Sequence, residues 1–173
     1  MRTRILVVGL PVLLVAAVGW FFGVRHGDGP LGDSGLGDKV CVQAGQSADG
    51  TVGHMPMLRN GGSGPVRITA VELIGPRNLD NGGAFLVPDP MSSGSKSGWA
   101  FGYGPFDGDV NKVRLAVDAE IAGKSETMLV VHVLRPDVLG EGHLDGVRVE
   151  YTAGLRRYAF ETGPEHTFRP GKC

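Results

Sequence analysis

The 173-residue chain has almost no net charge and only two cysteines. Lys and Arg total 17 against 18 Asp and Glu, so no basic surface indicates a nucleic-acid partner. No Cys-x-x-Cys pair suits redox or metal chemistry. No amphipathic helix of useful length is evident, nor is a nucleophile–base pair or a cluster of carboxylates. These absences argue against a nucleic-acid-binding protein, a helical bundle and an enzyme.

Glycine and proline, by contrast, are abundant. The chain has 29 Gly and 11 Pro, together roughly twice the usual share of a globular chain. Hydrophobic residues make up 42% and charged residues 20%, which is enough apolar content for a folded core. The length outside the apolar N-terminus fits one domain with a linker.

The run Ile5–Val24, ILVVGLPVLLVAAVGWFFGV, contains no charged residue. A helix of this length spans about 30 Å, the thickness of the hydrocarbon core of a bilayer. Arg2 and Arg4 precede the run, whereas Arg25 alone follows it before several acids. The positive-inside rule therefore predicts a cell-membrane anchor over 5–24, with the tail 1–4 in the cytoplasm and the rest of the chain outside.

A cleaved signal peptide is the alternative interpretation of this run. Its only fair cleavage site is Ala17-Val18-Gly19, and a cut there would leave Trp20 as the new N-terminus, inside the apolar run. The length of the run also favours an uncleaved signal-anchor over a signal peptide.

Two further features set the expected domain boundaries. Residues 25–40, RHGDGPLGDSGLGDKV, are rich in Gly and Asp and have little to bury, so a flexible linker is expected there. Cys41 and Cys173 are the only cysteines, and they stand at the two ends of the remaining chain. An even count outside the membrane favours a disulfide bond between them, which would define the ectodomain as 41–173.

Between the cysteines the apolar residues recur with a period of two, which is typical of β-strands. The clearest strand is Lys112–Ile121, and the apolar run Thr127–Leu134 is expected to form a hairpin with it as the more buried partner. Two further strands are expected over 147–152 and 157–161, on either side of the turn Ala153-Gly154. The other expected strands are Val40–Gln43, Thr51–Leu58, Val66–Ile74, Gly83–Val87, Gly98–Tyr103 and His166–Arg169. About seven to nine short strands predict an all-β chain that closes as a β-sandwich.

Three segments also resemble a known family. They are LRNGGSGPVRITAVELIGPRNL (Leu58–Leu79), AFLVP (Ala84–Pro88) and DGVRVEYTAGLRRY (Asp145–Tyr158). With the anchor and the terminal cysteine, they resemble actinobacterial single-pass membrane proteins with an immunoglobulin-like β-sandwich ectodomain. The resemblance implies that architecture, and it supplies no catalytic residue and no cofactor.

Two short motifs suggest metal ligands. Asp107, Asp109 and Asn111 have the oxygen spacing of a calcium loop, but Lys112 stands where such a loop needs glycine. His54, Met55 and Met57 offer the imidazole and thioether groups that suit Cu(I). On a strand, however, His54 points away from the two methionines. We therefore expect no metal site and no cofactor, and keep extracytoplasmic metal handling, of copper or weakly bound calcium, as the alternative function.

Four aromatic residues gather within one Gly-rich stretch: Trp99, Phe101, Tyr103 and Phe106. If the stretch is a strand, the first three share a face, and they form either part of the core or an exposed surface. An exposed aromatic surface would suit a protein or glycan partner. The sequence thus predicts a membrane-anchored extracytoplasmic binding or structural module of the cell envelope, with an envelope protein or glycan as partner.

Overall fold

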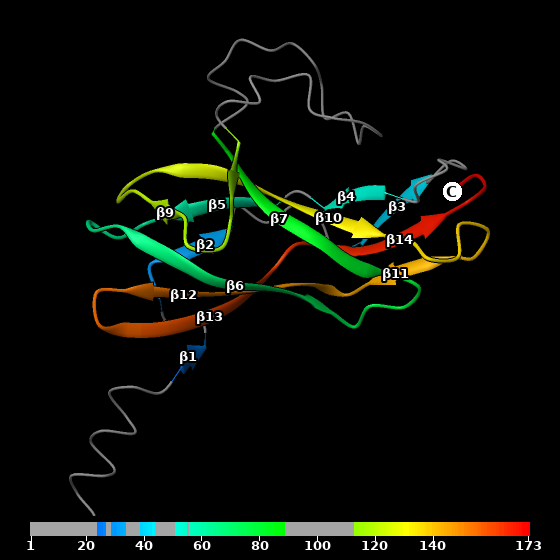
Figure 1. Cartoon of the computed structure of the whole chain (residues 1–173). Helices are drawn as coiled ribbons and strands as arrows, with labels where there is room; N and C mark the ends of the chain where they lie inside the picture. The colour runs from blue at the N-terminus through cyan, green and yellow to red at the C-terminus, as the bar shows by residue number, and fades with distance from the viewer. Residues whose placement is uncertain (1–23, 27–28, 34–38, 44–50, 55, 89–112) are drawn as a thin grey trace, which may run out of the picture.

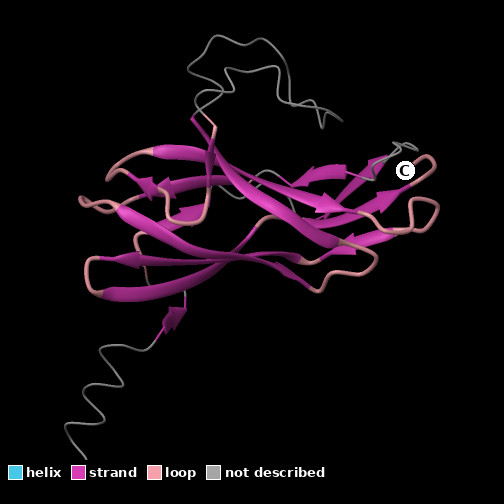
Figure 2. Cartoon of the chain, in the orientation of Figure 1, coloured by secondary structure: helices cyan, strands magenta, loops and turns pink. Residues whose placement is uncertain are grey.

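The computed structural model describes residues 24–26, 29–33, 39–43, 51–54, 56–88 and 113–173. Every regular element in these residues is a β-strand (Figures 1 and 2). The all-β prediction is therefore confirmed for the described part of the chain. No helix long and apolar enough to span a bilayer occurs there. The expected anchor, apart from Val24, lies outside the described residues.

The first sheet has five strands in the order β1-β13-β12-β6-β9. Its central strand β12 pairs antiparallel with β6 on one side and with β13 on the other. The predicted strand Val66–Ile74 and the two predicted strands on either side of Ala153-Gly154 are confirmed. The strands are Val24–His26 (β1), Arg156–Thr162 (β13), Gly146–Ala153 (β12), Val66–Ile74 (β6) and Glu120–Ile121 (β9).

The second sheet has six strands around β10, which is nine residues long. Its order is β2-β5-β10-β7-β8, and β4 also pairs with β10. The strands are Leu31–Asp33 (β2), Thr51–His54 (β4), Met57–Asn60 (β5), Glu126–Leu134 (β10), Asp80–Pro88 (β7) and Arg114–Leu115 (β8). The single strand expected over Thr51–Leu58 is thus divided into β4 and β5, with Pro56 between them. Pro56 has no backbone N–H for a ladder.

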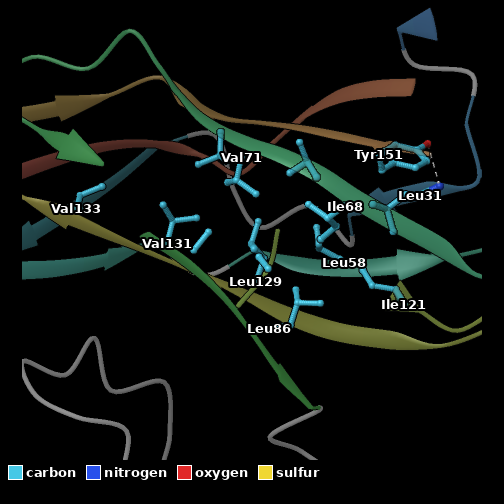
Figure 3. Packing of buried hydrophobic residues seen from close by; sticks show 14 of the residues in the cluster. Leu31, Leu58, Ile68, Val71, Leu86, Ile121, Leu129, Val131, Val133 and Tyr151 are labelled. Atoms are coloured by element: carbon cyan, nitrogen blue, oxygen red, sulfur yellow. Dashed lines mark hydrogen bonds between the residues drawn. The ribbon is translucent and has the colours of Figure 1, made fainter. Parts of the chain in front are cut away.

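The hydrophobic core lies between these two sheets (Figure 3). Alternate residues of β10 face it, and so do alternate residues of β6 and β12, because side chains along a strand point to opposite faces. The core residues include Leu58, Ile68, Leu86, Leu129, Val131, Val133, Val147, Val149 and Tyr151. The sandwich predicted from the strand pattern is therefore present.

A third, smaller sheet continues the sandwich at one end. It contains Gly142–Leu144 (β11), Glu165–Arg169 (β14) and Lys39–Gln43 (β3), with β14 in the middle and parallel to β3. Val42, Leu144 and Phe168 from these strands are buried in the same core cluster. The two expected end strands are therefore neighbours, which brings both cysteine-bearing segments together.

The strand expected over Lys112–Ile121 is wrong, and so is its hairpin with Thr127–Leu134. The segment crosses between the sheets: β8 pairs with β7 in the second sheet, and β9 pairs with β6 in the first. At the start of the segment the burial is opposite to the predicted alternation, because Leu115 is exposed and Ala116 is fully buried, whereas Ile121 at its end is buried as predicted. The apolar alternation thus runs across two short strands that belong to different sheets.

The flexible linker expected over residues 25–40 is also wrong for its described part. Leu31 is buried in the core, and its backbone N–H donates to the Tyr151 hydroxyl at 3.2 Å. The Asp33 carboxylate accepts hydrogen bonds from the Thr162 hydroxyl and from the Gly163 N–H. Strand β1 also extends the first sheet beside β13. The folded domain therefore begins before Cys41.

Candidate functional site

The predicted aromatic surface lies outside the described residues, which stop at Pro88 and resume at Val113. The same holds for the strand expected over Gly98–Tyr103. The residues concerned are Trp99, Phe101, Tyr103 and Phe106, together with the acidic turn Asp107, Asp109 and Asn111. The two interpretations of the aromatic stretch, as a core strand or as an exposed surface, therefore both stay predictions.

The structure joins Cys41 and Cys173 by a disulfide bond, as the sequence predicts. Their Cα atoms are 5.9 Å apart, within the usual range for native disulfides. Cys41 lies on β3 opposite Thr167 of β14, and both cysteines are exposed. The bond fastens the C-terminal residue to the outer side of the third sheet. No free cysteine occurs in the described part of the chain.

A row of ionisable side chains lies beside this disulfide, on β3, β11 and β14 and at Asp145, which directly follows β11. His143 Nε2 is 2.8 Å from an oxygen of Asp145, and His143 Nδ1 is 3.9 Å from Glu165. The other Glu165 oxygen is 3.0 Å from the ammonium group of Lys39. Asp145 is only two residues along the chain from His143, whereas Glu165 comes from β14. Asp145 and Glu165 thus approach the same imidazole ring at its two different ring nitrogens.

His166 occupies the opposite, buried face of the third sheet. Only 2% of its surface is exposed, and its ring stacks on Phe168 with centroids 5.7 Å apart. Its Nδ1 is 2.9 Å from the carbonyl oxygen of Pro164. Burial lowers the pKa of His166 below its ordinary value, although the contact with Pro164 opposes the shift. His166 is thus a buried histidine that packs on the aromatic ring of Phe168.

The copper motif is divided between two strands and a position that the structure does not describe. His54 ends β4, Met57 begins β5, and Met55 lies outside the described residues. Met57 is half-buried and faces Met128 across the ladder. Within the described ranges, no group of three or more His, Cys, Asp or Glu side chains is arranged to hold a metal ion.

A buried asparagine that the sequence analysis did not single out fixes one end of the sandwich. The Asn60 side chain is fully buried and donates to carbonyl oxygens of Gly64, Ile121 and Ala122 at 2.9, 3.1 and 3.0 Å. It also accepts a hydrogen bond from the N–H of Gly62. It thereby ties the turn after β5 to the turn after β9. A lone Asn before Gly-Gly gives only the signal of a turn, so its burial could not be read from the sequence.

Comparison with known proteins identifies no family and a distant structural similarity. No protein-family model matches the chain, and no curated protein matches it. Among solved structures, the chain is similar to the ASH / PapD-like domain of human CEP192 (PapD-like domain 7). That similarity has 10% sequence identity and a TM-score of 0.41, and covers 83% of this chain and 87% of that one. A likeness at this level carries no argument about function.

Proposed function

We propose that the chain is a membrane-anchored, non-catalytic binding or structural module of the cell envelope, with an immunoglobulin-like β-sandwich outside the cytoplasm. The observation that carries the proposal is the bond between Cys41 and Cys173. Both cysteines are exposed. Disulfides persist in oxidising compartments, whereas exposed thiols in the cytosol are kept reduced.

The uncharged run Ile5–Val24 supports the same location. Its arginine asymmetry favours a cytoplasmic N-terminus, so the domain after it would lie on the oxidising side. The two arguments are independent, because one rests on the charges near the N-terminus and the other on a bond at the C-terminus.

The partner in this proposal is an envelope protein or a glycan. Paired charges such as Arg67–Glu120 at 2.7 Å and Arg148–Glu161 at 2.8 Å lie on the first sheet, with side chains 39–57% exposed. Such a surface is well solvated and offers little for tight binding. The aromatic residues between Trp99 and Phe106 remain the predicted contact surface, because rigid rings lose little entropy on binding.

Protease digestion of intact spheroplasts tests the location. We expect added protease to remove the domain while the N-terminal anchor stays with the membrane. Freshly isolated protein should not react with thiol reagents until it is reduced. Full protection from protease, or free thiols in the fresh protein, would contradict the proposal.

Cross-linking in native membranes tests the partner. Wild type and Trp99→Ala are compared for the proteins and glycans they capture, and both are checked for equal unfolding midpoints. Loss of capture at unchanged stability would support the aromatic surface. A fall of about 3–5 kcal/mol in stability would instead make Trp99 a core residue.

A further inference from the structure

Three turns lie at one end of the first sheet, because their flanking residues pair in a single row. Arg156 faces Ala153, Ala153 faces Val66, and Val66 faces Ile121. The turns beyond this row are residues 154–155, 61–65 and 122–125. We call the three turns, together with the flanking Arg156, the entry end of the sandwich.

The entry end carries positive charge, and the acid that flanks it, Glu126, is paired with Arg59 at 3.4 Å. Lys124 and Arg156 are both exposed, and the three turns contain no Asp or Glu. The loop after β10, residues 135–141, differs, because it includes Asp137 and Glu141. That loop lies at the opposite end, since the nine residues of β10 separate the two positions by about 30 Å.

The tip of the β12–β13 turn adds an apolar side chain. Leu155 is 79% exposed and is absent from the core cluster. A single exposed leucine is ordinary on a protein surface. Amphipathic helices that bind anionic bilayers combine apolar side chains with cations, and Leu155 beside Arg156 presents the same two kinds of group on a turn.

The register of β1 places this tip on the side from which the chain enters the domain. β1 runs parallel to β13, with Val24 opposite Arg157 (Figure 1). Leu155 precedes Arg157 by two residues, so it reaches about 7 Å further toward the N-terminal side than Val24 does. Val24 is the last residue of the predicted membrane span. The tip therefore extends past the end of the predicted span, on the side of the expected bilayer.

We propose that the entry end docks on the bilayer surface, with Leu155 inserted among the lipids and with Arg156 and Lys124 against anionic headgroups. This inference rests on the proposed membrane anchor. It goes further because it fixes the orientation of the sandwich, with the entry end toward the lipid and the third sheet with its disulfide away from it.

Tryptophan substitution in the full chain tests the docking. Leu155→Trp is compared with Leu139→Trp, a matched control because Leu139 is 68% exposed in the loop at the opposite end. Each variant is reconstituted in phosphatidylcholine vesicles containing about a third phosphatidylglycerol. Quenching by lipids brominated on the acyl chain is measured after the wild-type signal of Trp20 and Trp99 has been subtracted.

The expected result is at least about twofold stronger quenching of the indole added at position 155 than of the one added at position 139. Adding Arg156→Gln and Lys124→Gln to the first variant should weaken that quenching. Equal quenching of the two added indoles, in chains that float with the vesicles, would overturn the docking and leave the anchor intact. A chain that does not float with vesicles would overturn the anchor, and the docking with it.

Discussion

Replacing Asn60 by alanine removes one buried group that connects two turns. The substitution deletes the three hydrogen bonds that Nδ2 donates to Gly64, Ile121 and Ala122, and the one that Oδ1 accepts from Gly62. The site has no exposed surface, so water cannot replace these bonds without rearrangement. The Ile121 carbonyl oxygen is also buried in this contact.

The cost follows from the number of bonds and their burial. A typical protein hydrogen bond contributes about 1 kcal/mol net, and an acceptor left buried without a donor costs about 1–3 kcal/mol. Because two N–H groups serve three carbonyls, the bonds to Nδ2 are partly shared. We therefore expect Asn60→Ala to lower the unfolding free energy by about 3–4 kcal/mol. Asn60→Asp should cost at least as much, because it buries a carboxylate where two N–H donors stood.

Urea unfolding of residues 24–173 measures this cost through the midpoint at constant slope. Asn81→Ala is the matched control. Asn81 is exposed and also bonds two backbone groups, the Val71 carbonyl at 3.1 Å and the Gly83 N–H at 2.9 Å. Its loss should cost about 1 kcal/mol or less, because water can reach the groups left behind. Equal midpoint shifts for the two alanine variants would refute the role assigned to burial.

Two further predictions concern the third sheet. Cys173→Ser should lower stability by up to about 5 kcal/mol, because the bond closes a loop with a sequence separation of 132; an unchanged urea midpoint would contradict it. His166, whose pKa burial lowers from its ordinary 6.5, takes up a proton more readily in the unfolded chain than in the folded one. The contribution of the neutral His166 ring to the free energy of unfolding is therefore fully present above about pH 6.5, and it is lost as the pH falls toward the lowered pKa. Melting temperatures should fall over that interval, and His166→Gln should flatten the profile; an equally steep profile in the variant would assign the effect to other groups.

The strands that the sequence predicted well are those whose pattern alone is enough. Residues 147–152 alternate apolar and polar residues, and Val66–Ile74 does so on either side of a register shift between Ile68 and Ala70; each strand packs one face on the core. The apolar run at 127–131 is buried without interruption, as expected for a central strand. In these segments the local pattern agrees with the tertiary environment. The strands could therefore be predicted without knowing which distant strands pair with them.

The residues that escaped prediction depend on partners far along the chain. Leu31 stands among glycines and aspartates, yet it is buried because Tyr151, 120 residues away, supplies a hydroxyl and an aromatic wall. His143 finds its second carboxylate on β14. The composition around Leu31 indicated nothing for it to pack against, and the sequence around His143 did not indicate that Glu165 of β14 lies near it. These partners come into contact only because strands distant in sequence pair with one another. The pairing cannot be derived from a single sequence.

In the segment Val113–Ile121 the alternation of apolar residues predicted one strand, but the chain crosses from one sheet to the other. Alternation continues through this segment, but the backbone turns at Asp118, whose φ is 66°. The N–H of Asp118 donates to the Ile68 carbonyl at 2.9 Å, which transfers the chain from the second sheet to the first. Asp tolerates this left-handed conformation, whereas a β-branched residue does so at a cost of about 1–2 kcal/mol.

We expect Asp118→Val to lower the unfolding free energy by that amount and Asp118→Gly to change it by less than about 1 kcal/mol. Because Asp118 is exposed, lost packing cannot account for a difference between them. If urea unfolding gives the two variants equal stability, the positive φ is not what ends the strand, and the crossing must instead be fixed by the burial of Ala116 and Ile121 on either side.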